Sequence, residues 1–133
     1  MTDSVPRRRA WNVTLWVLQI VAATAFVLVA AAKFTGAQLE VTTFHAIGLG
    51  DWFRYLVGGL EIAGAAGLLV PRLAGLAGLA LAGLMVGAVL TQLLVIGSGV
   101  AMPLPFLAVC CVIAWGRRDR TAALWALISR GRR

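Results

Sequence analysis

Residues 73–96, LAGLAGLALAGLMVGAVLTQLLVI, form an apolar run that contains no charged side chain. An α-helix rises about 1.5 Å per residue, so about 20 residues cross the roughly 30 Å of hydrocarbon in a bilayer. The run meets that length, and it lacks the period-two alternation of a membrane β-strand. It therefore predicts a membrane-spanning helix.

Three further apolar runs share this pattern. Residues 11–32 and 52–70 have spanning length, the second despite Arg54 and Glu61, and residues 100–116 form a shorter run that would tilt or borrow snorkelling arginines. We expect an all-α fold: a transmembrane antiparallel four-helix bundle with a partly ordered outer loop between its first two helices. The alternative is three spans, with the fourth run re-entrant because of its two prolines. The expected divisions are a basic N-terminus (1–10), a transmembrane domain (11–116, with spans at about 11–32, 52–70, 73–96 and 100–116) and a basic amphipathic tail (117–133).

The charges predict the orientation of these helices. The chain is 61% hydrophobic and 13% charged, with 12 Lys+Arg against 5 Asp+Glu, which excludes a disordered tail, a disulfide-rich secreted domain and a typical soluble enzyme. Positive charge concentrates in cytoplasmic loops of membrane proteins. If both termini lie on the same side of the membrane, ten of the twelve cations lie on that side and only Lys33 and Arg54 lie on the other. We therefore expect both termini in the cytoplasm. The ten cations of the cytoplasmic side are Arg7, Arg8, Arg9, Arg72, Arg117, Arg118, Arg120, Arg130, Arg132 and Arg133.

This topology also accounts for the net charge of +7, so we expect no nucleic-acid partner. All cations but Lys33 are Arg, and Ala and Gly are abundant, as in proteins of GC-rich bacterial genomes. We therefore expect a multi-pass protein of the bacterial plasma membrane, whose first run is an uncleaved signal-anchor because it is longer than a usual signal-peptide core. Residues 121–133 could lie on the inner leaflet as a basic amphipathic helix, or form a solvated tail.

Small residues at four-residue spacing predict close helix packing in a membrane. One ladder is Gly59, Ala63 and Gly67, a second is Ala74, Gly78 and Ala82, and Gly83 and Gly87 make a GxxxG pattern. The connection at Pro71-Arg72 is so short that the second and third spans must be antiparallel neighbours. We expect the lipid bilayer as one partner, together with either self-association or a membrane-complex partner.

Glu61 is the intramembrane acid that the sequence must accommodate. A carboxylate near the bilayer midplane faces the bundle interior, a cavity or a cationic partner. Arg54 lies two helical turns earlier on the same face, and Lys33 closes the first span from the same side. Gln92 and Thr91 offer neutral partners in the outer third, and Gln19 and Thr24 lie nearer the depth of Glu61. Lys33, Arg54, Glu61 and Gln92 are the candidate ligand or proton pocket; the alternative is a structural polar cluster.

No other residues suggest a reactive site. Adjacent helical residues point about 100° apart, so Cys110 and Cys111 cannot easily pair, and we interpret them as small buried hydrophobic residues. His45, the single histidine, has no cluster of Cys, Asp or Glu beside it that would hold a metal. We expect no catalytic residues and no metal. We also expect no cofactor; if the pocket does bind one, a quinone is the class that would suit it.

Several motifs together resemble the DoxX-like family of small four-helix membrane proteins. The resemblance covers about residues 11–116 and implies a four-helix bundle whose characteristic polar set is Lys33, Arg54 and Glu61. Relatives include a subunit of a thiosulfate:quinone oxidoreductase, a component of a membrane-associated oxidoreductase complex and an animal branch that assists receptor assembly. The cysteine pairs of a thiol-redox role are missing in this chain. The matching motifs are Ala31-Ala32-Lys33-Phe34, Phe44-His-Ala-Ile-Gly48-Leu-Gly50, Trp52-Phe-Arg54-Tyr-Leu-Val-Gly58-Gly-Leu-Glu61, Gly67-Leu-Leu-Val-Pro71-Arg72 and Leu84-Met85-Val-Gly87-Ala.

These observations favour a non-enzymatic accessory protein or subunit of a membrane complex, with a polar intramembrane pocket around Glu61. The competing hypothesis is a quinone-linked oxidoreductase subunit in which Glu61 relays protons and Lys33 or Arg54 holds an anionic substrate. A third hypothesis is small-molecule or proton-coupled transport by an oligomer.

Overall fold

The computed structural model describes residues 4–97 and 101–131, and all regular structure in these two ranges is helical. The expected all-α class is therefore confirmed. Residues 98–100, and with them the expected start of the fourth run at Val100, lie outside the described part, as do Arg132 and Arg133. The elements are the α-helices α1 (Ser4–Thr35), α2 (Gln38–Ile47), α3 (Asp51–Leu69), α4 (Ala74–Thr91), α5 (Leu104–Gly116) and α6 (Arg118–Gly131), and the π-helix η1 (Gln92–Ile96).

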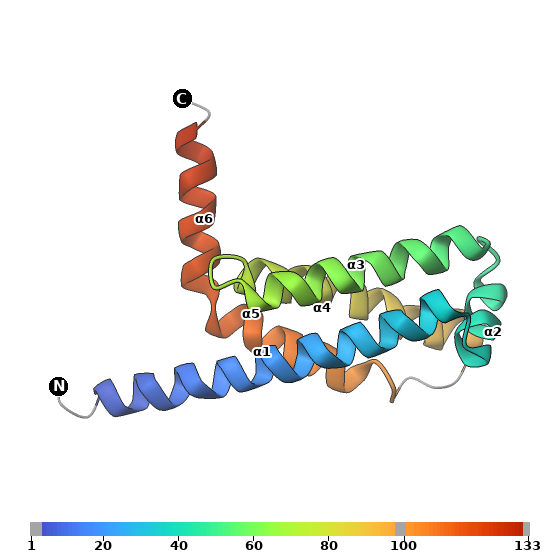
Figure 1. Ribbon diagram of the computed structural model, residues 1–133, viewed down its shortest axis with the longest axis horizontal. Helices are drawn as coiled ribbons and strands as arrows, with labels where there is room; N and C mark the ends of the chain where they lie inside the picture. The colour runs from blue at the N-terminus through green and yellow to red at the C-terminus, as the bar shows by residue number, and fades with distance from the viewer. Residues whose placement is uncertain (1–3, 98–100, 132–133) are drawn as a thin grey trace.

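Four helices, α1, α3, α4 and α5, lie side by side, and we call them the helical core (Figure 1). α1 packs on α3, α3 on α4, α4 on α5, and α5 on α1, with consecutive members running in opposite directions. Helix α2 covers one end of the core, where it packs on α3 and η1. At the other end α6 leaves the core and runs crosswise to it (Figure 1). We call the end of the core that α2 covers the α2 end, and the end from which α6 leaves the α6 end.

Length and composition qualify two segments for crossing a membrane. They are Arg8–Thr35 and Ala74–Ile96, the second comprising α4 and η1. Helix α5 is apolar but has only 13 residues, and α3 has 19 residues but carries Asp51, Arg54 and Glu61. The long apolar runs thus form helices, although two of the four expected spans depart from the simple pattern.

The segment between the first two expected spans is more regular than a partly ordered loop. It holds the ten-residue helix α2, which a glycine ends. Gly48 adopts a left-handed φ of 82°, a conformation that glycine accepts without a Cβ clash, and its N–H donates to the carbonyl oxygen of Phe44 (3.2 Å). This helix brings Glu40 and Phe44 over the α2 end of the core.

Close packing uses only some of the small residues in the ladders. A Cβ on Gly67 would lie 2.9 Å from that of Ala77, and one on Gly78 would lie 3.0 Å from the backbone nitrogen of Ala114. These glycines let α3 and α5 approach α4 closely. By contrast, a Cβ on Gly59, Gly83 or Gly87 would meet no described atom within 4 Å. The GxxxG pattern at residues 83–87 therefore lies on an unpacked face.

Candidate functional site

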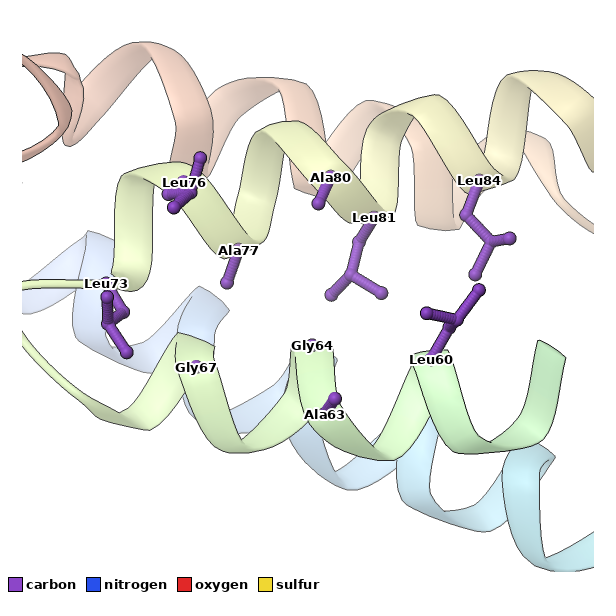
Figure 2. Close-up of a pocket in the computed structure, with 10 residues that line it drawn as sticks. All are labelled: Leu60, Ala63, Gly64, Gly67, Leu73, Leu76, Ala77, Ala80, Leu81 and Leu84. Atoms are coloured by element: carbon purple, nitrogen blue, oxygen red, sulfur yellow. The ribbon is translucent and has the colours of Figure 1, made fainter. Parts of the chain in front are cut away.

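An apolar groove of about 400 Å³ runs between α3 and α4, and the ten residues that line it are all Leu, Ala or Gly (Figure 2). Leu60 of α3 and Leu84 of α4 point toward one another across it (Figure 2). Such a lining offers no side-chain hydrogen-bonding group. The polar chemistry of the protein lies at the two ends of the core.

At the α2 end, Lys33 joins three helices. Its Nζ lies 2.9 Å from Oε1 of Glu61 on α3 and 3.5 Å from Oε2 of Glu40 on α2. Lys33 is 6% exposed and Glu61 1% exposed, so this is a buried ion pair. A buried charge keeps its ionised form at tolerable cost only when a partner lies close by. Lys33 therefore ties α1 and α2 to Glu61.

Gly58 and a group of aromatic rings enclose this ion pair. A Cβ on Gly58 would lie 3.1 Å from Cε2 of Phe34 and 3.5 Å from Cβ of Lys33, so the absence of a side chain lets α1 reach α3. Nζ of Lys33 also lies 5.9 Å from the ring centre of Phe44, which packs on Phe53 (5.8 Å between centroids). The rings keep the pair away from solvent.

Arg54 is buried at the same end but is not joined to Glu61. It is 5% exposed, and its Nη2 lies 3.8 Å from Oδ1 of the exposed Asp51 and donates to the hydroxyl of Tyr55 (3.2 Å). Its Nε and Nη1 find no hydrogen-bond partner within the described part of the chain. Nη1 lies beneath the α1–α2 turn, 3.7 Å from where a Cβ on Gly36 would stand. Arg54 thus has donor capacity that the surrounding protein leaves unused.

Two acceptor atoms at the candidate pocket are also unused. Oε2 of Glu61 and Oε1 of Gln92 are buried, and neither bonds to any described residue. Gln92 begins η1, and π-helical turns inside longer helices often mark functional sites. The four candidate residues therefore divide into a bonded pair, Lys33–Glu61, and two residues, Arg54 and Gln92, that form no hydrogen bond or ion pair with that pair.

The other expected neutral partners lie elsewhere. Thr24 and Thr91 each donate to a carbonyl of their own helix, that of Ile20 (2.9 Å) and that of Gly87 (2.8 Å). Gln19 is fully buried, but at the opposite end of α3 from Arg54. Serine and threonine hydroxyls in membrane helices commonly donate to a carbonyl of their own helix, as Thr24 and Thr91 do, because the bond keeps an unpaired donor away from lipid.

Gln19 belongs to a second polar centre, at the α6 end, that the sequence interpretation missed. Its Nε2 donates to the carbonyl of Leu68 (2.7 Å), and its Oε1 accepts from Nε of Arg117 (2.8 Å). Nη1 of Arg117 donates to Oδ1 of Asn12 (2.8 Å), while its Nη2 is buried without a described partner. Burial, and secondarily the charge of Arg120, lowers the pKa of the Arg117 guanidinium, although an arginine stays protonated.

A sequence signal for this second centre exists. Asn12 and Gln19 stand seven residues apart, hence two turns along one face of α1. That pair of amides marks a face of α1 that receives a polar side chain. The burial of Arg117 was not predicted, because it begins a run of cations that the positive-inside rule already accounts for as a cytoplasmic segment.

The remaining reactive side chains form no second site. Both cysteines are free thiols; Cys110 is buried as expected, but the expectation was wrong for Cys111, which lies on the exposed face of α5. His45 lies on the exposed side of α2. Within residues 4–97 and 101–131, no three His, Cys, Asp or Glu side chains cluster closely enough to hold a metal.

Comparison with known proteins identifies the family. A model of the DoxX-like family matches residues 17–116, which include the whole helical core beyond the first part of α1. No curated protein and no solved structure matches the chain. The match covers most of the chain, and two helices have the length and composition to cross a bilayer. This small membrane protein belongs to the DoxX-like family.

Proposed function

We propose that the protein is a non-enzymatic accessory subunit of a membrane complex in the bacterial plasma membrane, and that its α2 end binds a polar group supplied from outside the chain. The observation that carries this proposal is the buried guanidinium of Arg54, two of whose nitrogens, Nε and Nη1, have no described partner. A buried donor without a partner costs about 1–3 kcal/mol. A protein that retains such a group gains from a ligand or partner that satisfies it.

The proposed arrangement is a transmembrane antiparallel four-helix bundle, with α1, α3, α4–η1 and α5 as its spans. The 19 residues of α3 extend about 28 Å, close to the hydrocarbon thickness, and the 13 residues of α5 extend about 20 Å, so α5 must tilt or end in a thinned region. Arg72, Arg117, Arg118 and Arg120 lie at the α6 end. The positive-inside rule then assigns the α6 end, with both termini, to the cytoplasm.

In this proposal the ion pair and the unpaired residues have different tasks. Lys33 and Glu61 hold α1 against α3, since their charges compensate each other at 2.9 Å. Arg54 and Gln92 keep hydrogen-bonding groups that a ligand would satisfy, and Oε2 of Glu61 is the atom that would accept a proton or a ligand hydrogen bond. A partner subunit would supply acceptor oxygens to Arg54 from the outer side of the membrane.

The accessory role predicts one stoichiometric partner that depends on Arg54. Membranes from a strain producing a tagged chain at its native level would be solubilised in mild detergent, and the purified complex analysed by mass photometry. Arg54→Gln should lose the partner, whereas Arg72→Gln, an exposed arginine at the α6 end, removes the same charge and should retain it. A wild-type chain that purifies alone, or equal loss with both variants, would contradict the proposal.

A quinone-linked oxidoreductase subunit is the second candidate, because the unused groups include both donors and acceptors. Quinone carbonyls accept hydrogen bonds, as Arg54 requires, and quinol hydroxyls donate them, as Glu61 and Gln92 require. Phe34 and Tyr55 stack at 5.8 Å beside Arg54, which offers an aromatic wall.

Binding of a short-chain menaquinone to the protein in nanodiscs tests this candidate. Titration calorimetry should give saturable binding that Arg54→Gln weakens about tenfold, the usual effect of losing a charge-assisted hydrogen bond. Arg72→Gln is again the control. Heat that does not saturate, or that is unchanged in Arg54→Gln, excludes a quinone site at Arg54.

A further inference from the structure

Among residues 4–97 and 101–131, no acid compensates the buried arginine at the α6 end. Arg117 is 9% exposed, and the residues that bond to it, Gln19 and Asn12, are neutral amides. Asp119, two residues along the chain, is exposed and forms no ion pair with it in the described structure. A buried cation that is hydrogen-bonded but not charge-compensated attracts an anion from outside the chain.

The guanidinium is also held in a fixed position. Two of its nitrogens are engaged at 2.8 Å, so the fork cannot rotate away, and its third nitrogen, Nη2, has no described partner. The backbone is equally constrained, because a Cβ on Gly75 would lie 2.5 Å from the carbonyl oxygen of Arg117. Fixed N–H donors suit the oxygens of a phosphate group better than a mobile side chain does.

The surroundings of Arg117 are those of a membrane–water interface. Its guanidinium carbon lies 5.8 Å from the ring centre of Trp16, and Trp11 packs on Trp115 nearby (6.3 Å between centroids). Tryptophans gather at the depth of lipid headgroups. Helix α6 begins at the next residue and runs crosswise to the core (Figure 1), with Trp125 and Ile128 exposed and Arg130 in its last turn. A basic amphipathic helix with this direction lies in the interfacial plane.

We infer that Arg117, held by Gln19 and Asn12, binds the phosphate group of an anionic phospholipid at the α6 end. The lipid phosphate accepts from Nη2 and supplies the negative charge that the described residues do not place beside Arg117. Arg120 lies beside the site and adds positive charge that attracts anionic lipids. Arg118 instead stacks on Trp115 (4.2 Å from the guanidinium carbon to the ring centre) and donates to its carbonyl oxygen (2.8 Å). The site is distinct from the cluster at the α2 end, so either can fail without the other.

Native mass spectrometry of the full-length protein tests the site. The detergent-solubilised chain is mixed with phosphatidylglycerol and phosphatidylcholine at equal concentration, and bound lipid is counted. The wild type should retain phosphatidylglycerol preferentially, and Arg117→Gln should reduce that preference about tenfold because a charge-assisted hydrogen bond and a net charge are lost. Arg118→Gln removes the same charge from an exposed neighbour and should change the preference less than about twofold.

A second pair of variants keeps the test valid if Arg117→Gln fails to fold. Asn12→Asp is isosteric and gives Arg117 an internal carboxylate, so it should abolish the preference while the fold is retained. Asn12→Ala frees a further N–H of Arg117 and should keep the preference. Equal preference in the wild type and Asn12→Asp overturns the inference, as does equal loss in Arg117→Gln and Arg118→Gln. Complete displacement of the lipid by millimolar inorganic phosphate overturns the assignment to a lipid.

Discussion

At the α2 end of the helical core Lys33 lies between two carboxylates, whereas at the α6 end Arg117 lies between two amides. Both cations are buried, and both link α1 to other helices. The charge of Lys33 is compensated within the chain by Glu61 and Glu40. Arg117 has two of its nitrogens bonded to neutral amides, and no described acid compensates its charge. The comparison separates two uses of a buried cation, to hold helices together and to attract an anion.

Removal of Glu61 should have the largest effect on stability. Glu61→Ala leaves Lys33 with only the more distant Glu40, and breaking one partner out of a buried pair costs about 3–5 kcal/mol. The double variant Lys33→Met/Glu61→Leu removes both charges and should regain most of this loss. Unfolding in mixed micelles, followed by circular dichroism, measures both. A loss below about 1 kcal/mol in Glu61→Ala would show that Lys33 does not depend on Glu61.

Replacement of Gln19 by Leu should have the next largest effect on stability, since it removes the amide that bonds to both Leu68 and Arg117. The carbonyl of Leu68 and Nε of Arg117 both lose a buried partner, for which we expect about 2–3 kcal/mol in the same unfolding measurement. Thr24→Val is the control, because that exposed hydroxyl bonds only to its own helix and its loss should cost less than about 0.5 kcal/mol. Similar values for the two variants would contradict the described network.

Two glycines of α4 differ in how closely they are packed: Gly75 lies against other helices at the α6 end, whereas Gly83 lies on the outer face of α4. A Cβ on Gly75 would overlap the backbone of Arg117 and the hydroxyl of Thr121, so Gly75→Ala should destabilise the protein by about 1–3 kcal/mol. Gly83→Ala adds the same methyl group where no described atom lies within 4 Å and should be neutral or stabilise the helix by up to about 1 kcal/mol. If Gly83→Ala is instead the more damaging variant, the exposed GxxxG face is packed in the membrane.

Much of the fold is predictable from the sequence, because charged residues, a proline or glycines bound each apolar run. The expected span 73–96 matches α4 and η1 except for Leu73, and the expected span 52–70 differs by one residue at each end from α3. Helix α2 was not predicted, since ten residues with a mixed composition carry no long periodic signal. Its boundaries are visible only as glycines, Gly36 and Gly48, whose left-handed conformation is not evident before the structure is known.

The candidate site was less predictable than the fold. The proximity of Lys33 to Glu61 follows from the side of the membrane on which the first span ends. The contact between Gln19 and Arg117 joins residues 98 positions apart and depends on which face α5 turns toward α1, which local sequence does not specify. Arg54 shares a face with Glu61, but its long side chain extends toward Asp51 and Tyr55 instead, a choice of rotamer that spacing cannot predict.

The smallest expected effect tests whether Arg54 is available to a ligand. Asp51 is 77% exposed and lies 3.8 Å from Arg54, a solvent-screened pair worth less than about 0.5 kcal/mol. Asp51 also lies in the first turn of α3, as Asp119 does in α6, so both carboxylates favour the positive end of a helix. The difference between Asp51→Asn and Asp119→Asn in thermal unfolding therefore isolates the ion pair from the helix-end term. A difference within about 0.5 kcal/mol means that Asp51 does not compensate Arg54, which leaves the guanidinium free for an external acceptor. A difference of about 2 kcal/mol would make Asp51 a true partner, and the α2 end would then be as self-contained around Arg54 as it is around Lys33.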